Sequence, residues 1–209
     1  GGLAACQERA ATGNLPLIDD LNDNEGHIPN NDGRLGGWFV YNDGTGSQWP
    51  ARDESCDYPA GFPVANGQAC TRGSGFTKYG AAMGVALNTS FDCVHSCGYD
   101  ATVYRGVRFT ISGEVPGGTR RFQAETAETR GLSYGGLCAD TSVCGDVYGT
   151  SVQVTGTPKT VEIPWTQLQQ QGYGTKVSFN VRRIFTLHWK IQPGAGAAFS
   201  LCVDDVSFY

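Results

Sequence analysis

The chain has little of what helical, membrane-spanning and nucleic-acid-binding proteins have in abundance. Its 209 residues include a single Met, and its longest apolar runs are much too short to cross a bilayer. The 15 Lys and Arg residues form no basic cluster, and 20 Asp and Glu residues outnumber them, which gives a net charge of −5. We therefore expect no membrane partner and no nucleic-acid partner.

Glycine and aromatic residues, by contrast, are abundant. The 30 Gly residues and the 11% of aromatic residues are typical of β-structure with many tight turns. No internal repeat, block of charge or linker-like tract divides the sequence. We therefore predict one domain over residues 1–209, large enough to bury a core, and a monomer.

Alternation of apolar and polar residues predicts many short strands. The segments with this pattern are 36–43, 80–88, 104–113, 120–129, 150–165, 182–192 and 197–209. Only residues 164–172 have a helical pattern, with Gly172 as the stop. Strands with one apolar and one polar face predict an all-β fold, a two-sheet antiparallel β-sandwich of the jelly-roll or galactose-binding-like type.

The stretch from 49 to 80 fits no strand well. It contains Pro50, Pro59 and Pro63 together with two cysteines. We interpret it as a long surface loop, an insertion held by a disulfide.

The eight cysteines are the strongest signal in the composition. Their even number predicts four disulfides and an oxidising compartment, so the protein is expected to be secreted or on the cell surface, extracellular or periplasmic. Zinc fits poorly, because no C-x2-C pair occurs and the three histidines are far from the cysteine pairs. Many pairings are open; short loops favour Cys93–Cys97, Cys138–Cys144 and Cys56–Cys70, which leaves Cys6 for Cys202.

Strand alternation also predicts a polar face. The apolar phase holds Val107, Phe109, Phe122, Ala124, Leu187 and Trp189. The opposite phase then carries Arg108, Gln123, Glu125, His188 and Lys190. If these strands share a sheet, the face offers donors and acceptors for sugar hydroxyls, beside candidate aromatic platforms at Tyr41, Phe39, Trp49, Tyr134 and Tyr148. The other interpretation is a solvated sheet face with cross-strand ion pairs.

Catalysis on this face would need more groups than the sequence offers. A glycosidase usually needs two carboxylates, and Glu125 is the only one on the predicted face. A lyase would use His188, Lys190 and Arg108 against a uronate, with Tyr134 as proton donor. No Ser-His-Asp order, nucleophile motif or phosphate loop is present, so we assign no catalytic residue.

Several segments in order resemble one family. "LPLIDDLNDNEGHIPNNDGRLGGWFVYNDGTG" (15–46) resembles the opening of secreted bacterial carbohydrate-binding-module-like sandwiches. "YRGVRFTISG", "VEIPWTQLQQQGYG", "IFTLHWKIQ" and "FSLCVDDVSFY" match later landmarks of the same pattern. The resemblance covers most of 15–209 outside the stretch 49–80.

The resemblance implies a galactose-binding-like jelly roll that binds a polysaccharide, most typically a β-glucan-like one, on its concave sheet without cleaving it. Two alternatives stay open. One is a polysaccharide-active enzyme, a lyase or hydrolase, on the same face. The other is a surface adhesion or structural domain that binds another protein.

The resemblance further implies a structural calcium ion between the N-terminal loop and the last strand. Its oxygen ligands would come from Asp20, Asn22, Asp23, Asp204 and Asp205. Where the pattern usually has Phe-Glu, this sequence has Leu21-Asn22, so an amide replaces a carboxylate and affinity would be weaker. The other interpretation is that Asp204 and Asp205 cap a turn or pair with Arg.

Overall fold

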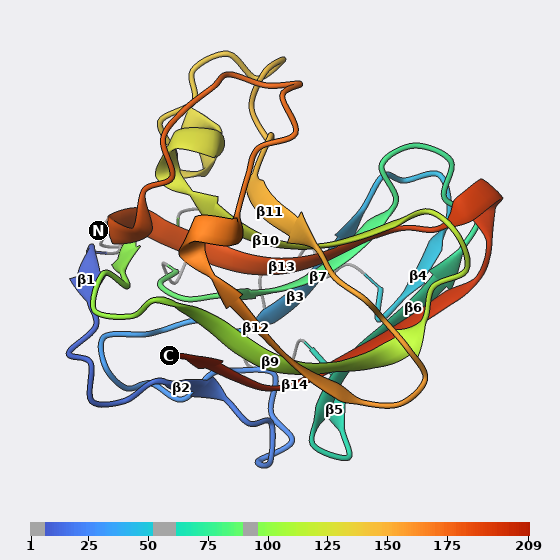
Figure 1. Ribbon diagram of the computed structural model, residues 1–209, viewed down its shortest axis with the longest axis horizontal. Coiled ribbons are helices and arrows are strands. Elements are labelled where there is room, and N and C mark those ends of the chain that lie inside the picture. Colours follow the sequence, from blue (N-terminus) through green and yellow to red (C-terminus); the bar gives the residue numbers. More distant parts are fainter. Residues whose placement is uncertain (1–6, 52–61, 90–95) are drawn as a thin grey trace, which may run out of the picture.

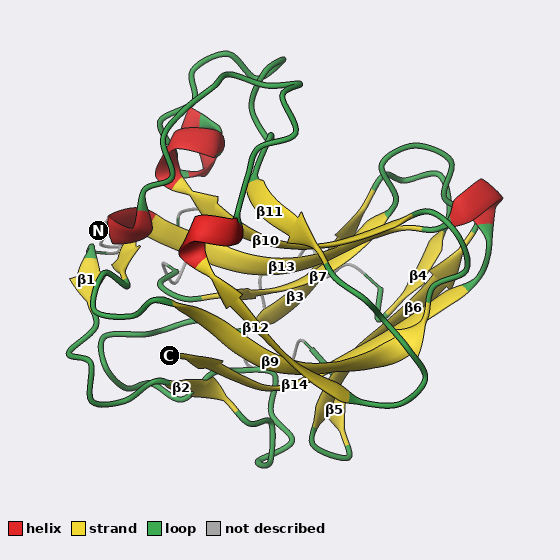
Figure 2. Ribbon diagram, in the orientation of Figure 1, coloured by secondary structure: helices red, strands yellow, loops and turns green. Residues whose placement is uncertain are grey.

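The computed structural model describes residues 7–51, 62–89 and 96–209, and these residues form two β-sheets packed face to face (Figures 1 and 2). The predicted all-β sandwich of two antiparallel sheets is confirmed. Short 3₁₀ turns connect the strands: η1 (Ala127–Thr129), η2 (Leu132–Tyr134), η3 (Trp165–Gln167), η4 (Val181–Arg183) and η5 (Gly194–Gly196).

The first sheet has the antiparallel order β3-β7-β13-β10-β11. Two short strands extend it, because β8 pairs with the start of β13 and β1 runs parallel to β8. Its strands are β1 (Arg9–Ala10), β3 (Trp38–Asn42), β7 (Ala81–Ala86), β8 (Tyr99–Asp100), β10 (Thr119–Thr126), β11 (Tyr148–Ser151) and β13 (Ile184–Gln192).

The second sheet has the order β12-β9-β14-β6-β4, with β2 paired to β14 and β5 paired to β6. All of these pairings are antiparallel. Its strands are β2 (Leu17–Asp19), β4 (Ser47–Trp49), β5 (Val64–Ala65), β6 (Gln68–Ser74), β9 (Gly106–Glu114), β12 (Lys159–Pro164) and β14 (Phe199–Phe208).

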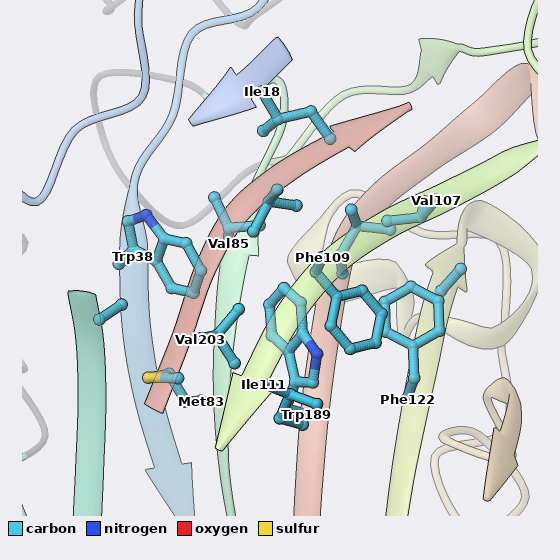
Figure 3. Packing of buried hydrophobic residues seen from close by; sticks show 14 of the residues in the cluster. Ile18, Trp38, Met83, Val85, Val107, Phe109, Ile111, Phe122, Trp189 and Val203 are labelled. Atoms are coloured by element: carbon cyan, nitrogen blue, oxygen red, sulfur yellow. The ribbon is translucent and has the colours of Figure 1, made fainter. Parts of the chain in front are cut away.

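The core lies between the sheets and is rich in aromatic rings (Figure 3). Trp189 of the first sheet makes an edge-to-face contact with Phe109 of the second, with ring centroids 5.2 Å apart. Trp38 stacks on the same indole at 5.5 Å. The side chains predicted for the apolar phase are all buried: Val107, Phe109, Phe122, Ala124, Leu187 and Trp189. The close packing of these rings between the sheets favours this one register of the strands.

Residues 62–80 differ from the predicted loop. β5 and β6 form a hairpin whose turn is Asn66-Gly67, with φ of 56° and 66°. Two positive φ values are the signature of a tight hairpin turn, for which Asn-Gly is the preferred sequence. β6 then pairs with β14 in the second sheet. The loop prediction is therefore wrong for the hairpin, and residues 52–61 lie outside the described part of the chain.

The predicted helix at 164–172 is reduced to the single 3₁₀ turn η3, after which Leu168 is extended. The chain then returns to the first sheet, where Gln169 bridges to Gly149. Within the residues described, no helix is both long enough and apolar enough to span a bilayer.

The disulfides confirm one predicted pairing and correct two. Cys138–Cys144 is present, but Cys70 pairs with Cys202, so Cys56–Cys70 and Cys6–Cys202 are wrong. The reason is the sheet: Cys70 of β6 and Cys202 of β14 are direct cross-strand partners, with Cα atoms 4.1 Å apart. Cys97 is also disulfide-bonded. Its predicted partner Cys93, like Cys6 and Cys56, lies outside the described residues.

Candidate binding site on the first sheet

The outer face of the first sheet, the face turned away from the core, carries its side chains in three rows set by strand register. The histidine row contains Phe39, Gly84, His188, Gln123 and Gly149. The lysine row contains Tyr41, Ala82, Lys190, Arg121 and Ser151. The glutamate row contains Ala86, Thr186 and Glu125. Because all three rows stand on paired strands, their spacing is fixed by backbone hydrogen bonds.

Most of the predicted ligand-binding residues meet on this outer face. Tyr41, Gln123, Glu125, His188 and Lys190 lie in its rows. Arg108 does not share this face, contrary to the prediction, because β9 belongs to the second sheet, where the Arg108 side chain pairs with Glu162.

Three aromatic residues predicted as platforms separate in the structure. Phe39 lies in the histidine row. Trp49 ends β4 of the second sheet, where the Arg72 guanidinium covers its ring at 4.4 Å. Tyr148 turns toward Phe179, with ring centroids 5.2 Å apart, and packs against the core.

A continuous hydrogen-bond chain crosses the outer face. The Glu125 carboxylate accepts hydrogen bonds from Arg130 Nη1 at 2.5 Å and from Thr186 Oγ1 at 2.9 Å. Thr186 Oγ1 lies 2.5 Å from His188 Nε2, and the Tyr41 hydroxyl lies 3.1 Å from His188 Nδ1. A hydroxyl has one proton to give, and Thr186 gives it to the carboxylate. His188 Nε2–H must then donate to Thr186, which leaves Nδ1 as acceptor for the Tyr41 hydroxyl.

The protonation states agree with this direction. Burial lowers the pKa of His188 to about 4, so the ring is neutral at pH 7. Burial alone would raise the pKa of Glu125, but the charge of Arg130 and the hydrogen bonds from Arg130 and Thr186 hold it below its ordinary value. Burial raises the pKa of Tyr41, which keeps its hydroxyl protonated as a donor. Glu125 and Arg130, the two charged groups of this hydrogen-bond chain, therefore neutralise each other.

Two glycines shape the histidine row. A Cβ at Gly84 would meet Phe39 Cζ at 2.7 Å and His188 Cδ2 at 3.0 Å, so the aromatic ring lies across β7 only because no side chain is there. A Cβ at Gly149 would meet Gln123 Cγ at 2.8 Å. The absence of side chains at both positions lets the larger groups lie flat along the sheet.

Gln123, in the same row, is 2% exposed. Its side-chain amide makes no hydrogen bond to any residue that the structure describes, and neither amide atom is among the fully buried unpaired atoms of that part of the chain. The amide therefore keeps some contact with solvent. Such an amide has two donors and an acceptor open to a ligand.

Exposed tyrosines border the outer face. Tyr79 is 43% exposed and covers Lys190 Nζ with its ring at 5.2 Å. Tyr134 is 56% exposed, 5.8 Å from the Arg130 guanidinium. Tyr173 is equally exposed, and its hydroxyl donates to the Gly145 carbonyl at 2.7 Å. The segments that carry these rings rise from the first sheet on the side away from the second sheet (Figure 1). Loop residues have no periodicity, so only Tyr134 was predicted.

The residues predicted to hold calcium lie around the end of β2 and a bulge in β14, the central strand of the second sheet. Burial raises the pKa of Asp204, and the charges of Asp205 and Asp20 add to this effect, so these carboxylates are near one another. Among the described residues, no group of three or more His, Cys, Asp or Glu side chains is arranged to hold a metal ion. The acidic residues thus fit calcium only in part, and calcium stays a prediction.

Comparison with known proteins identifies the architecture. No protein-family profile matches the sequence, and no curated protein matches it. The fold is similar to the family 11 carbohydrate-binding module of the cellulosomal cellulase Lic26A-Cel5E of Clostridium thermocellum, with a TM-score of 0.53 and 14% identity over 92% of each chain. A family 11 module from the same organism, in complex with a β-1,3-1,4-mixed-linked tetrasaccharide, gives a TM-score of 0.51 at 13% identity over 92% of this chain and 94% of that one. The chain therefore has the two-sheet β-sandwich fold of carbohydrate-binding modules.

Proposed function

We propose that the outer face of the first sheet binds a polysaccharide and does not cleave it. The observation that carries the proposal is the amide of Gln123. It is nearly buried on a rigid strand, has no hydrogen-bond partner among the described residues, and shares its face with Lys190, whose ammonium lies under the exposed ring of Tyr79. Sugar recognition combines polar groups at fixed positions, which bond to hydroxyls, with aromatic rings against which the C–H face of a pyranose packs. Similarity to carbohydrate-binding modules in fold supports the proposal.

The arrangement of the ionisable groups favours binding over catalysis. Both ring nitrogens of His188 are engaged, one with Tyr41 and one with Thr186. The Glu125 carboxylate is held by Arg130 and Thr186. A general base must have a free lone pair within reach of the substrate proton. The one lone pair of the His188 ring accepts the Tyr41 hydroxyl, and Glu125 is anchored through Oε2 by Arg130 and Thr186, so we assign both groups to fixing the outer face.

The polymer and the location of the protein each have separate support. A β-glucan backbone is supported by the mixed-linked tetrasaccharide bound to the similar module, so such glucans are the first polymers to test. Secretion or display on the cell surface is supported by the disulfides, because each described cysteine is bonded. The monomeric state and the lack of a nucleic-acid partner stay predictions.

Retention in native gels that contain polysaccharide tests the proposal. We expect retention by at least one polymer in a panel of glucans, xylans and uronate polymers. No new reducing ends and no unsaturated-uronate absorbance should appear. Gln123→Ala should weaken binding about five- to a hundredfold, because a nearly buried hydrogen-bonding partner is lost.

The matched control is Arg108→Ala, which removes a polar side chain from the outer face of the opposite sheet. Equal retention of Gln123→Ala and the parent would move the site elsewhere. Measurable cleavage, abolished by Glu125→Gln, would replace the proposal with a polysaccharide-active enzyme. Failure of the whole panel would favour the adhesion or structural alternative.

A further inference from the structure

Two cations face each other on the outer face of the first sheet. Arg121 of β10 and Lys190 of β13 are direct cross-strand partners in the lysine row. Both side chains are partly buried. Like charges directly opposite each other destabilise a sheet, and burial increases the cost. Folding alone gives no reason for this pair.

The cations are poorly satisfied inside the protein. Within the described part of the chain, Lys190 makes no hydrogen bond and no ion pair, and its ammonium rests on the ring of Tyr79. Arg121 donates one hydrogen bond, from Nη2 to the Gln169 carbonyl at 3.1 Å, and its Nε is buried without a described partner. Burial lowers the pKa of both groups. Most of their hydrogen-bonding capacity is therefore unused.

The surrounding groups do not cancel this charge. Asp146 acts electrostatically on both cations but makes an ion pair with neither among the described residues. Its carboxylate instead accepts from the backbone amides of Gln171, Gly172 and Gly174. Glu125 is paired with Arg130, and His188 is neutral. Tyr41, Tyr79 and Tyr173 are phenols, so they bring no negative charge at neutral pH. The lysine row therefore has a net positive charge.

We propose that the bound polysaccharide carries acid groups, uronate carboxylates or sulfate esters, and that Arg121 and Lys190 together hold one of them. This inference rests on the proposed function and deepens it. A guanidinium fork matches the two oxygens of a carboxylate or sulfate, and an adjacent ammonium adds a second positive charge. The bound anion would relieve the repulsion between the cations. Tyr79, whose ring covers the Lys190 ammonium, lies where a flanking sugar ring would pack.

A matched pair of polymers isolates the acid group. Mixed-linked β-1,3-1,4-glucan and the same glucan oxidised at C6 to glucuronate differ only in their carboxylates. Polygalacturonate with its carboxyl-reduced form, and dextran with dextran sulfate, extend the comparison to another backbone and to sulfate. We expect at least one acidic member to bind ten- or more-fold more tightly than its neutral partner. That binding should weaken as NaCl rises from 50 to 500 mM, because salt screens the attraction.

Variants link the effect to the two cations. Lys190→Gln and Arg121→Gln should each reduce affinity for the acidic polymer about ten- to a hundredfold more than affinity for the neutral polymer. Arg108→Gln, on the other sheet, removes the same unit of charge and should change neither. Lys190→Gln should also melt at the same temperature as the parent or higher, because a repulsion is removed.

The outcomes separate the two claims. Equal affinity for neutral and acidic partners overturns this inference and leaves the proposed function standing. An equal loss in Arg108→Gln also overturns it, because the attraction would then be only the net charge. No retention by any of the six polymers or the wider panel overturns both. Selective binding by the acidic member, lost in Lys190→Gln, confirms the inference.

Discussion

The two outer faces of the sandwich use the same kinds of residue in opposite ways. On the second sheet, polar side chains pair with their cross-strand neighbours: Arg108 with Glu162, and the hydroxyl of Thr110 with that of Thr160. Farther along, Cys70 and Cys202 are joined covalently. On the first sheet, Arg121 stands opposite Lys190 and the Gln123 amide is unpaired among the described residues.

This difference indicates which face has polar groups available to bind a ligand. A sheet face that satisfies its own polar groups contributes to stability and offers little to a ligand. A face that leaves them unpaired is less stable alone and gains most when a ligand arrives. The ion pairs of the two faces differ in exposure. The side chains of Arg108 and Glu162 are 47% and 50% exposed, whereas those of Arg130 and Glu125 are 18% and 12% exposed.

The largest effect is expected from the disulfide of the second sheet. Replacing Cys70 and Cys202 by Ser should lower the free energy of unfolding by about 4 kcal/mol, because the bond closes a loop with a sequence separation of 132. Urea denaturation measures this change. Polysaccharide affinity of the folded variant should equal that of the parent. A loss of affinity below the melting transition would contradict the separation of the two faces.

A somewhat smaller effect on stability is expected from the ion pair between Arg130 and Glu125 on the first sheet. Arg130→Met leaves the Glu125 carboxylate without its cation in a mostly buried place, and should cost about 3 kcal/mol of stability. Arg108→Met breaks the exposed pair on the second sheet and should cost under about 1 kcal/mol. Equal costs in urea denaturation would show that the two faces do not differ in this respect.

The third effect depends on pH and belongs to His188. Its folded pKa is about 4, below the ordinary value of 6.5, so between these pH values the unfolded chain binds more protons. Stability from the neutral ring is therefore present at pH 7 and lost as pH falls toward 4. The cost of His188→Gln should be about 2–3 kcal/mol larger at pH 7 than at pH 4.

One other group titrates in the same range with the opposite sign. Burial raises the pKa of Asp19 to about 6, so its contribution to stability decreases as pH rises toward that value. The parent and the His188→Gln variant both contain Asp19, so the contribution of Asp19 cancels in the difference between their stabilities. Urea unfolding at pH 4, 5, 6 and 7 gives that difference. A constant cost of His188→Gln across the series would show that folding does not lower the pKa of the ring.

The smallest of these effects on stability is expected from calcium, whose predicted ligands belong to the second sheet and the turn that follows β2. If the ion binds at Asp20, Asn22, Asp23, Asp204 and Asp205, a tenfold excess over Kd stabilises the fold by about 1.4 kcal/mol. Chelation with EDTA should lower the melting temperature by a few degrees and leave polysaccharide affinity unchanged. An unchanged melt, together with no bound metal by elemental analysis, would remove calcium from the account.

Strand alternation predicted the fold well because side chains of a strand point alternately to its two faces. Phe109, Phe122 and Trp189 were therefore placed in the core correctly. Alternation does not say which sheet a strand joins. Arg108 has the same phase as Gln123, but β9 pairs with β12 and β14, so the residue lies on the opposite side of the sandwich.

Other errors have equally local causes. The Asn66-Gly67 turn signal was present, but the prolines and cysteines around it favoured a loop. Short sequence separation favoured Cys56–Cys70, whereas sheet pairing brings Cys70 to Cys202. Arg121 has the same phase as Gln123 and Glu125 but was not among the predicted residues, and its pairing with Lys190 became visible only in the sheet register. Tyr79 and Tyr173 lie between strands, where only the folded chain reveals their neighbours.

The most direct test of the central claim is the map of backbone amide shifts in NMR spectra as polysaccharide fragments are added. We predict that the shifted amides cluster on β10, β13 and β7 and in the segments around Tyr79, Tyr134 and Tyr173. Amides of β9, β12 and β6 should stay unchanged. Shifts concentrated on the second sheet, or spread evenly over both, would contradict the account.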